Sequence, residues 1–284
     1  MGYTIFEKII AVFIAIAAWN STTVSNYFFS DQKMPVNSQT EQFLTDTLRN
    51  EDKLLDYLFP TDGIDDNFIP PYNLTYTIAE FQKFKGTYLQ KTEAVGSSYF
   101  DDTILLGDSL TFGLQLNGLI PSDKVLAIVG KGVYNILDSE TTLTASSEKK
   151  KVIDLLTDVQ PKKIYVNMGT NGVSDLTNEQ HMVYYNKMLD RIKTACPSAT
   201  IILVAISPWS EIHSEINTKI NHFNMYLLET AKSSGMYFVN AAEALMNGKG
   251  ALPDSYCSSG DGIHWNYAAQ TAYMNYLKTH TIYQ

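Results

Sequence analysis

From Tyr99 to the C-terminus, short apolar runs alternate with longer stretches in which apolar residues recur every three or four positions. The short runs predict buried strands and the longer stretches predict amphipathic helices. The predicted strands are Thr103 to Leu106, Lys124 to Val129, Lys163 to Met168, Thr200 to Ile206 and Tyr237 to Asn240. Strands that alternate with helices are typical of a parallel sheet covered on both faces. The pattern therefore predicts an α/β fold: a three-layer α/β/α sandwich with a central parallel five-stranded sheet.

One of the intervening helices has a clear start and end in the sequence. Thr177 and Gln180 have the spacing of a capping box, in which each side chain bonds the backbone of the other. Apolar residues then recur at helical spacing until Pro197, which cannot continue a helix. We expect a helix between these limits, packed on the sheet.

The N-terminal part of the chain has a different pattern. An uninterrupted apolar run from Ile9 to Trp19 follows Lys8 and has the length of a signal-peptide core rather than a membrane span. Residues 1–19 are therefore expected to be a signal peptide or a membrane anchor, with a buried N-terminal helix as the alternative. The protein is then exported, and is either secreted or anchored at the cell surface.

A stalk or linker and a helical segment are predicted to separate this run from the α/β domain. Residues 20–37 are polar and without periodicity, whereas residues 38–96 have apolar residues at helical spacing in two stretches, Ser38 to Phe59 and Ile78 to Ala94. This N-terminal helical segment is either a brace packed on the main domain or a lid over its site, and we favour the brace. The main domain is assigned to residues 97–284.

Composition and charge exclude some classes of function. Hydrophobic residues make up 45% of the chain, which suffices for a sizeable core. The net charge of −9 and the single basic cluster at Lys149–Lys151 argue against a nucleic-acid partner. Cys196 and Cys257 are expected to be free thiols, because the predicted topology puts them at opposite ends of the sheet. His181, His213, His222 and His280 have no partner at metal-ligand spacing, so no metal is expected.

Two short motifs contain the candidate chemistry. Gly-Asp-Ser-Leu at residues 107–110 follows the first predicted strand, and Asp-Gly-Ile-His at residues 261–264 precedes the last helix. A serine is a poor nucleophile until an imidazole takes its proton, and a carboxylate holds that imidazole in the required tautomer. Ser109, His264 and Asp261 supply these three groups. The alternative is a purely structural role, in which Ser109 caps a helix and Asp261 forms a turn.

Together with two further motifs, these residues resemble a known family. Gly132 follows the second predicted strand, and Gly-Thr-Asn at residues 169–171 follows the third. Four such blocks in this order resemble the SGNH, or GDSL, hydrolases from Tyr99 to the C-terminus. The resemblance implies a flavodoxin-like sheet, Ser109 as nucleophile, His264 as general base and acid, and Asp261 as its orienting carboxylate. It also implies an oxyanion hole formed by the backbone N–H groups of Ser109 and Gly132 and the side-chain amide of Asn171, and no cofactor.

The chain departs from the family pattern at one position and is ambiguous at another. The third block of the family usually has Asp after Asn, but Gly172 stands there in this chain. Gly130 is a rival to Gly132 in the second block, and we favour Gly132. The Gly-x-Ser-x-Gly motif of α/β-hydrolases is absent, since Thr111 occupies the place of its second glycine.

The expected function is that of a serine esterase that hydrolyses carboxylic esters through an acyl-enzyme on Ser109. We favour a short-chain or O-acetyl ester of a carbohydrate as the substrate. The carbohydrate is either a small molecule or a polysaccharide. The alternatives are an acyltransferase to a sugar hydroxyl, a lipase or thioesterase, and a non-catalytic binding module. Membrane contact is expected only through an N-terminal anchor. Trp209 and Trp265 are expected near the cleft, with no assigned role in substrate choice.

Overall fold

The computed structural model describes residues 65, 67–144, 147–258 and 260–282. The chain divides into two compact units, Met1–Gly63 and Ile64–Gln284, and all described residues belong to the second. The apolar run, the stalk and the predicted helix from Ser38 to Phe59 lie outside the described residues. In the part of the chain that is described, no helix combines the length and the apolar character needed to cross a membrane. Export therefore stays a prediction.

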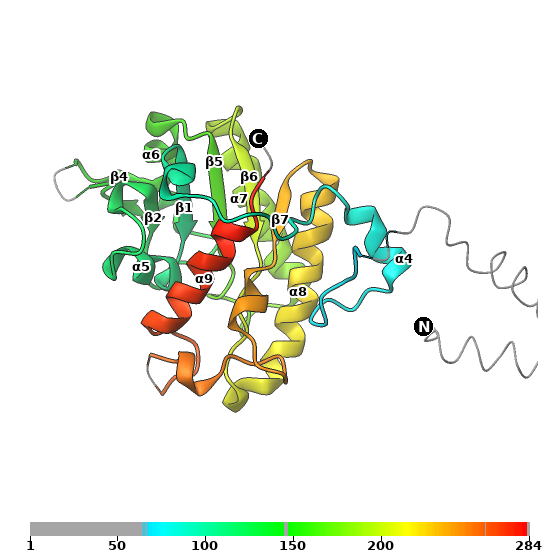
Figure 1. Ribbon diagram of the computed structural model, residues 1–284. Helices are drawn as coiled ribbons and strands as arrows, with labels where there is room; N and C mark the ends of the chain where they lie inside the picture. Colours follow the sequence, from blue (N-terminus) through cyan, green and yellow to red (C-terminus); the bar gives the residue numbers. More distant parts are fainter. Residues whose placement is uncertain (1–64, 66, 145–146, 259, 283–284) are drawn as a thin grey trace, which may run out of the picture. The chain divides into compact units, whose positions relative to one another are not determined.

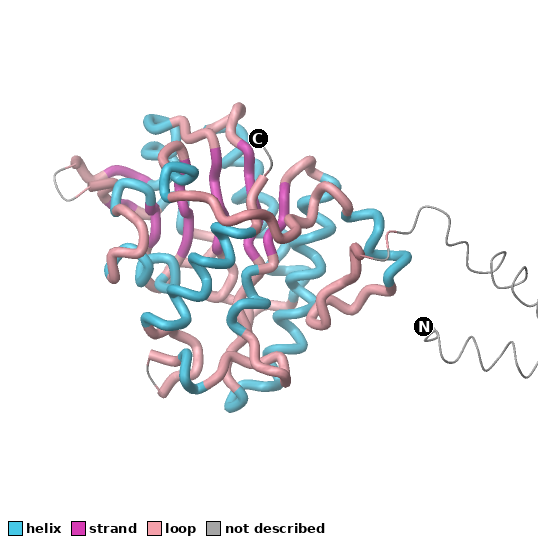
Figure 2. The backbone as a smooth tube through the Cα atoms, viewed as in Figure 1, coloured by secondary structure: helices cyan, strands magenta, loops and turns pink. Residues whose placement is uncertain are grey.

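Five parallel strands form the central sheet (Figures 1 and 2). They are β1 (Thr103–Gly107), β2 (Val125–Ala127), β5 (Lys163–Asn167), β6 (Thr200–Val204) and β7 (Tyr237–Val239). Their order in the sheet is β2-β1-β5-β6-β7, and each neighbouring pair is parallel. All five predicted strands are confirmed. The second is shorter than predicted because the chain turns at Gly130, which has a positive φ of 73°.

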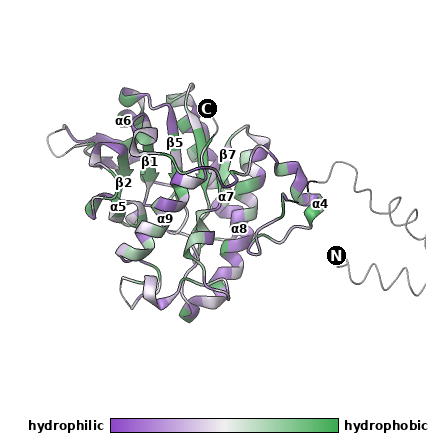
Figure 3. Cartoon of the chain, in the orientation of Figure 1, coloured by the Kyte–Doolittle hydropathy of each residue, from purple (hydrophilic) through white to green (hydrophobic). Residues whose placement is uncertain are grey.

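Helices cover both faces of this sheet, as the sequence pattern predicts. On one face lie α6 (Val152–Val159), α7 (Asn178–Ala195) and α8 (Ser214–Ser233), and on the other lie α5 (Ser109–Leu116) and α9 (Tyr267–Thr279). Alternate strand residues face the two layers: Ile104 and Leu106 pack with the first set of helices, and Leu105 packs with the second. The strands are largely green in Figure 3, the colour of hydrophobic residues. The three-layer sandwich is therefore confirmed.

Two smaller features complete the domain. The predicted capping box is present at the start of α7, where Thr177 and Gln180 each bond the backbone of the other. A two-stranded antiparallel ribbon, β3 (Glu140–Thr141) with β4 (Lys150–Lys151), precedes α6. The last two lysines of the cluster therefore form β4, directly before α6, on the surface of the domain.

The predicted helix from Ile78 to Ala94 is wrong beyond its first turns. Helix α4 covers only Ile78–Phe81, a 3-10 turn follows at Gln82–Phe84, and the chain then turns at Gly86 with φ 82°. Beyond that turn, Leu89 N–H donates to Phe238 O at 2.8 Å, and Phe238 N–H donates to Thr87 O at 2.9 Å. Backbone pairing with the exposed edge of β7 replaces the helix, because an edge strand offers unpaired N–H and C=O groups.

The described part of this N-terminal segment packs as a brace. Phe68, Phe81 and Phe84 are at most 1% exposed and belong to the same core cluster as α7 and α8. Lys83 forms an ion pair with Glu229 of α8 at 2.7 Å, and Tyr76 donates to the same carboxylate. These contacts cover β7 and α8. For the described residues, the segment is therefore part of the core structure.

Two buried asparagines of α8 hold the loop that follows β6. The Asn224 side chain accepts from Ile206 N–H at 2.7 Å and donates to Ile206 O at 3.0 Å. Two helical turns earlier in α8, Asn217 makes the same two bonds with the backbone of Trp209, both at 2.8 Å. Each amide thus satisfies two buried backbone groups that no strand partner reaches. This pairing fixes the loop that continues to Ser210.

Replacing Asn224 by alanine tests this clamp. Asn224→Ala leaves two buried backbone groups of Ile206 without partners, so we expect the free energy of unfolding to fall by about 2 to 4 kcal/mol. Asn275→Ala, at an exposed position of α9, is the matched control and should change it by less than about 0.5 kcal/mol. Urea unfolding followed by circular dichroism measures both values. Equal stability of the two variants would contradict the clamp.

Candidate active site

The candidate residues converge where the strand order reverses. If the five strands are numbered one to five along the chain, their order in the sheet is 2-1-3-4-5. The strand order therefore reverses between the first and third strands, which are β1 and β5. Ligands of open parallel sheets bind outside the carboxyl ends of the strands at such a point. Ser109 follows β1 and Asn171 follows β5, which places both at this edge. The sheet thus brings together residues from motifs far apart in the sequence.

Ser109 begins α5, but it does not cap that helix. Asp108 is the N-cap, and its Oδ1 accepts from Leu110 N–H at 3.0 Å. A β-carbon at Gly107 would collide with the Thr111 side chain, so only glycine lets the strand and the helix approach this closely. The cap function therefore belongs to the preceding aspartate, and the Ser109 hydroxyl is free for another partner.

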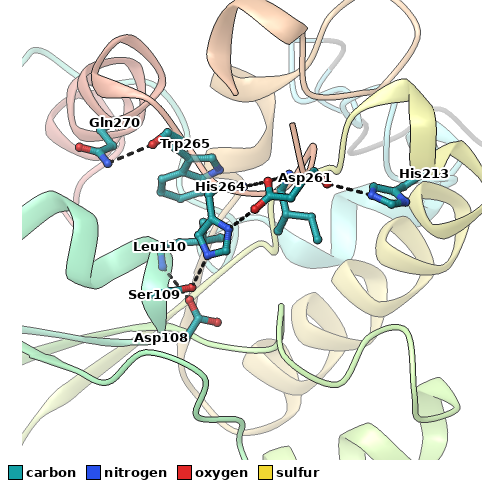
Figure 4. A network of polar contacts seen from close by, with 9 residues as sticks. Asp108, Ser109, Leu110, His213, Asp261, His264, Trp265 and Gln270 are labelled. Atoms are coloured by element: carbon teal, nitrogen blue, oxygen red, sulfur yellow. Dashed lines mark hydrogen bonds and ion pairs between the residues drawn. The ribbon is translucent and has the colours of Figure 1, made fainter. Parts of the chain in front are cut away.

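That partner is His264, as Figure 4 shows. Ser109 Oγ lies 2.9 Å from His264 Nε2, and His264 Nδ1 lies 2.7 Å from Asp261 Oδ2. A carboxylate accepts from Nδ1–H, so Nε2 is the unprotonated nitrogen and accepts the hydroxyl proton. The three side chains that the sequence singles out form one continuous hydrogen-bonded chain in the order Ser, His, Asp.

The loop that carries Asp261 and His264 is held by several local bonds. Asp261 Oδ1 accepts from the N–H groups of Ile263 and His264 at 2.9 and 3.1 Å, so the carboxylate closes its own turn. His213 Nε2 donates to Asp261 O at 2.9 Å (Figure 4). This role of His213 was missed in the sequence, where it stands 48 residues from Asp261 and no spacing links the two.

Gly262 sits at the tightest point of this loop. Its φ is +69°, and a β-carbon there would collide with the Ser210 side chain. Ser210 N–H donates to Gly262 O at 2.8 Å, which ties the loop to the segment that Asn217 and Asn224 hold. A glycine is required here by backbone conformation and by space. Its position between Asp261 and His264 therefore determines how those two side chains face each other.

Gly132 and Asn171, the other predicted site residues, lie beside each other. A β-carbon at Gly132 would stand 3.2 Å from Asn171 O, whereas one at Gly130 would have nothing within 4 Å. Gly132 N–H donates to Asn135 Oδ1 at 3.0 Å, and Asn171 Nδ2 donates to Lys131 O at 3.1 Å. Of the two rival glycines, the one that contacts Asn171 is Gly132.

Asp108 is a buried acid directly below the serine. It is 1% exposed, and burial raises the pKa of its carboxyl to about 6, against the opposing effects of the Leu110 N–H bond and the charge of His264. The second carboxylate oxygen, Oδ2, is buried without a hydrogen-bond partner among the described residues. Asp108 therefore acts on the site by capping α5, the helix that Ser109 begins.

The two predicted tryptophans pack in the interior. Trp209 is 7% exposed and contacts His213 edge-on, and Trp265 is 4% exposed and packs on Tyr273. Neither presents an open aromatic face. Tyr134 and Tyr184 are exposed aromatic residues that line a cavity with Gly172. They were missed because the exposure of Tyr134 depends on the path of the loop after β2 and that of Tyr184 on how α7 packs.

Outside the candidate site, the two cysteines can be compared with their predicted state. Cys196 is buried, Cys257 is partly buried, and both are free, as predicted. Within the ranges that the structure describes, no three side chains of His, Cys, Asp or Glu gather closely enough to hold a metal ion.

Sequence comparison decides the family. The profile of the GDSL-like Lipase/Acylhydrolase family matches residues 105–272, which is more than half of the chain. The chain belongs to this family. It is therefore a hydrolase that acts on ester bonds, and the matched residues include Ser109, Asp261 and His264. No curated protein matches the chain.

Several solved structures are similar to this GDSL-type hydrolase at low sequence identity. A GDSL-like lipase of Bacteroides thetaiotaomicron is 18% identical, with a TM-score of 0.48 over 61% of this chain and 83% of its own. The OSK domain of Drosophila Oskar is 15% identical, with a TM-score of 0.47 over 64% and 90%. A carbohydrate esterase family 3 protein of Talaromyces cellulolyticus is 16% identical, with a TM-score of 0.41 over 61% and 92%.

Adding one methyl group at Gly262 tests whether the loop geometry controls activity. Gly262→Ala must move Ser210 or the loop, so we expect kcat/KM for p-nitrophenyl acetate to fall by about 10- to 100-fold. Gly260→Ala is the matched control, because a β-carbon there has nothing within 4 Å. Circular dichroism should show both variants folded. Unchanged activity of Gly262→Ala would show that this turn does not position Asp261 and His264.

Proposed function

We propose that the protein is a serine esterase that forms an acyl-enzyme on Ser109. The observation that carries this proposal is the continuous chain from Ser109 Oγ through His264 to Asp261, at 2.9 and 2.7 Å. It supplies a nucleophile, a base within reach of its proton and a carboxylate that fixes the base. Family membership independently supports ester chemistry.

The first half of the reaction uses His264 as base and then as acid. Ser109 Oγ attacks the ester carbonyl carbon while its proton passes to His264 Nε2. Asp261 accepts from Nδ1–H and stabilises the imidazolium that forms. When the tetrahedral intermediate collapses, the bond to the alcohol oxygen breaks and that oxygen takes the proton from Nε2. The acyl group remains on Ser109.

The second half returns the enzyme to its starting state. Water attacks the acyl carbon and gives its proton to His264 Nε2. The second tetrahedral intermediate then releases the carboxylic acid, and the Ser109 oxygen recovers its proton from Nε2. Atoms and protons balance without any cofactor, since each proton that His264 accepts is given back in the same half-reaction.

Three N–H groups are proposed to stabilise the negative charge on the carbonyl oxygen. They are the backbone N–H of Ser109, the backbone N–H of Gly132 and the side-chain amide of Asn171. The Asn171 amide has two N–H donors and uses one on Lys131 O, which leaves the second for the substrate. Gly132 N–H is paired with Asn135 Oδ1, so it must share that hydrogen bond or break it when the oxyanion forms.

The substrate that the site supports best is a short-chain or O-acetyl ester of a carbohydrate. The cavity beside Gly132 and Asn171 is lined by Tyr134, Gly172, Asp175, Leu176 and Tyr184, so Leu176 is the one aliphatic side chain in its lining. A site for a long acyl chain needs a channel lined mainly by apolar side chains. With one aliphatic side chain in its lining, this cavity supports a small acyl group over a long lipid chain.

Replacing the nucleophile tests the proposed mechanism. Ser109→Ala removes the only oxygen that the mechanism acylates, so we expect kcat for p-nitrophenyl acetate to fall by a factor on the order of 1,000 or more. Ser122→Ala, at an exposed serine of a surface turn, is the control and should retain wild-type kcat. Release of p-nitrophenol is followed by absorbance. Wild-type turnover by Ser109→Ala would remove Ser109 from the mechanism.

A further inference from the structure

A cavity of about 380 Å³ opens beside Gly132 and Asn171, two of the three proposed oxyanion donors. It is lined by Tyr134, Gly172, Asp175, Leu176 and Tyr184. Its volume lies in the range of sites for small ligands. It borders the site directly, because Gly172 follows Asn171 in the chain and a β-carbon at Gly132 would stand 2.7 Å from Cε1 of Tyr134.

Two tyrosines of this cavity have large exposed aromatic surfaces. Tyr134, in the loop after β2, is 53% exposed, and Tyr184, on α7, is 41% exposed. Their rings meet edge to face with centroids 6.0 Å apart. Lys187 Nζ lies over the ring of Tyr184 at 5.9 Å, so Tyr134 offers the more open face. Exposed aromatic faces that line a cavity next to reactive groups are suited to binding a ring-shaped substrate.

Gly172 forms part of the cavity lining. Its φ of +113° is a conformation that other residues rarely adopt, and a β-carbon there would stand 3.6 Å from both Leu176 and His181. A longer side chain at this position would extend from the cavity wall. Gly172 is also the position at which the chain departs from the family block, where aspartate is usual. At this departure from the family block, the residue that lines the cavity has no side chain.

The charges around the cavity restrict its occupant. Asp175 is exposed and offers a carboxylate that already accepts from Ser174 Oγ at 2.8 Å. His181, below Gly172, is fully buried, and burial lowers its pKa to about 4, so it carries no charge at neutral pH. An acceptor carboxylate suits hydroxyl donors and repels phosphate or uronate groups. Leu176 and the two tyrosine rings suit the C–H face of a neutral sugar.

We infer that this cavity binds a neutral pyranose ring of the ester substrate, with Tyr134 as its stacking platform and Tyr184 as its side wall. The inference rests on the proposed function and specifies its alcohol part: the ester carbonyl lies at Gly132 and Asn171 while the sugar ring occupies the cavity next to them. The π face of tyrosine carries partial negative charge and attracts the partly positive C–H groups of the ring. Asp175 accepts from a ring hydroxyl.

The experiment compares two acetate esters that differ only in the alcohol part. Glucose pentaacetate contains a neutral pyranose ring and ethyl acetate contains none, and release of acetic acid from both is followed by pH-stat titration. We expect the wild-type protein to prefer glucose pentaacetate in kcat/KM. Tyr134→Ala should reduce the ratio of the two kcat/KM values by about tenfold, chiefly through KM for the sugar ester, because an aromatic contact of this kind is worth about 1.4 kcal/mol.

Further variants separate ring contact from general damage. Tyr134→Phe keeps the ring and should retain the wild-type ratio. Tyr184→Ala removes the side wall, should also lower the ratio, and decides the question if Tyr134→Ala does not fold. Tyr226→Ala, at a tyrosine of α8 that is 42% exposed and outside the cavity, is the matched control and should leave both rates unchanged.

The outcomes distinguish this inference from the proposed function. If wild-type protein hydrolyses both esters and the ratio is the same in Tyr134→Ala and Tyr184→Ala, the sugar site is wrong and the esterase proposal stands. A wild-type preference for ethyl acetate, or for 1-palmitoyl-lysophosphatidylcholine over glucose pentaacetate, also overturns the sugar site. If Ser109→Ala hydrolyses both esters at the wild-type rate, the proposed function itself fails.

Discussion

The hydrogen bond between Ser109 Oγ and His264 Nε2 is the contact on which the proposed chemistry depends, and it joins residues 155 positions apart. Neither partner can reach the other through local structure. The parallel sheet solves this problem because the carboxyl ends of its strands lie at one edge, where the strand order reverses between β1 and β5. The apolar runs that build the sheet therefore determine where the nucleophile stands, and the loop before α9 determines where the base stands.

The geometry at this edge is maintained by polar groups that are not themselves proposed to react. Asp108 caps α5 and leaves the Ser109 hydroxyl to His264. Asn217 and Asn224 hold the loop after β6, and Ser210 of that loop bonds Gly262. Each link satisfies buried backbone groups that would otherwise lose hydrogen bonds on folding. The site is therefore built on a hydrogen-bonded frame that reaches from α8 to the Asp261 turn.

The sequence predicts the sheet well and the supporting polar contacts poorly, for physical reasons. Strand identity follows from runs of apolar residues, and the Ser109, Asp261 and His264 assignments follow from motifs, so both could be made without coordinates. The helix predicted from Ile78 to Ala94 is wrong beyond Phe84, because its apolar spacing does not record that residues 87–89 pair with β7. His213 and the exposure of Tyr134 depend on how separate loops meet, and no local pattern in the chain encodes such a meeting. The preference for Gly132 over Gly130 came from the family block, and the contact with Asn171 agrees with it.

The central claim is that Ser109 is the one serine made nucleophilic by His264. It is tested most directly by reacting the folded protein with a fluorophosphonate and locating the adduct by peptide mass spectrometry. The account predicts one adduct per chain, on the peptide that contains Ser109, and its loss when His264 is replaced by glutamine. An adduct on another serine, or an esterase that stays active and unlabelled after exposure to the reagent, would contradict it.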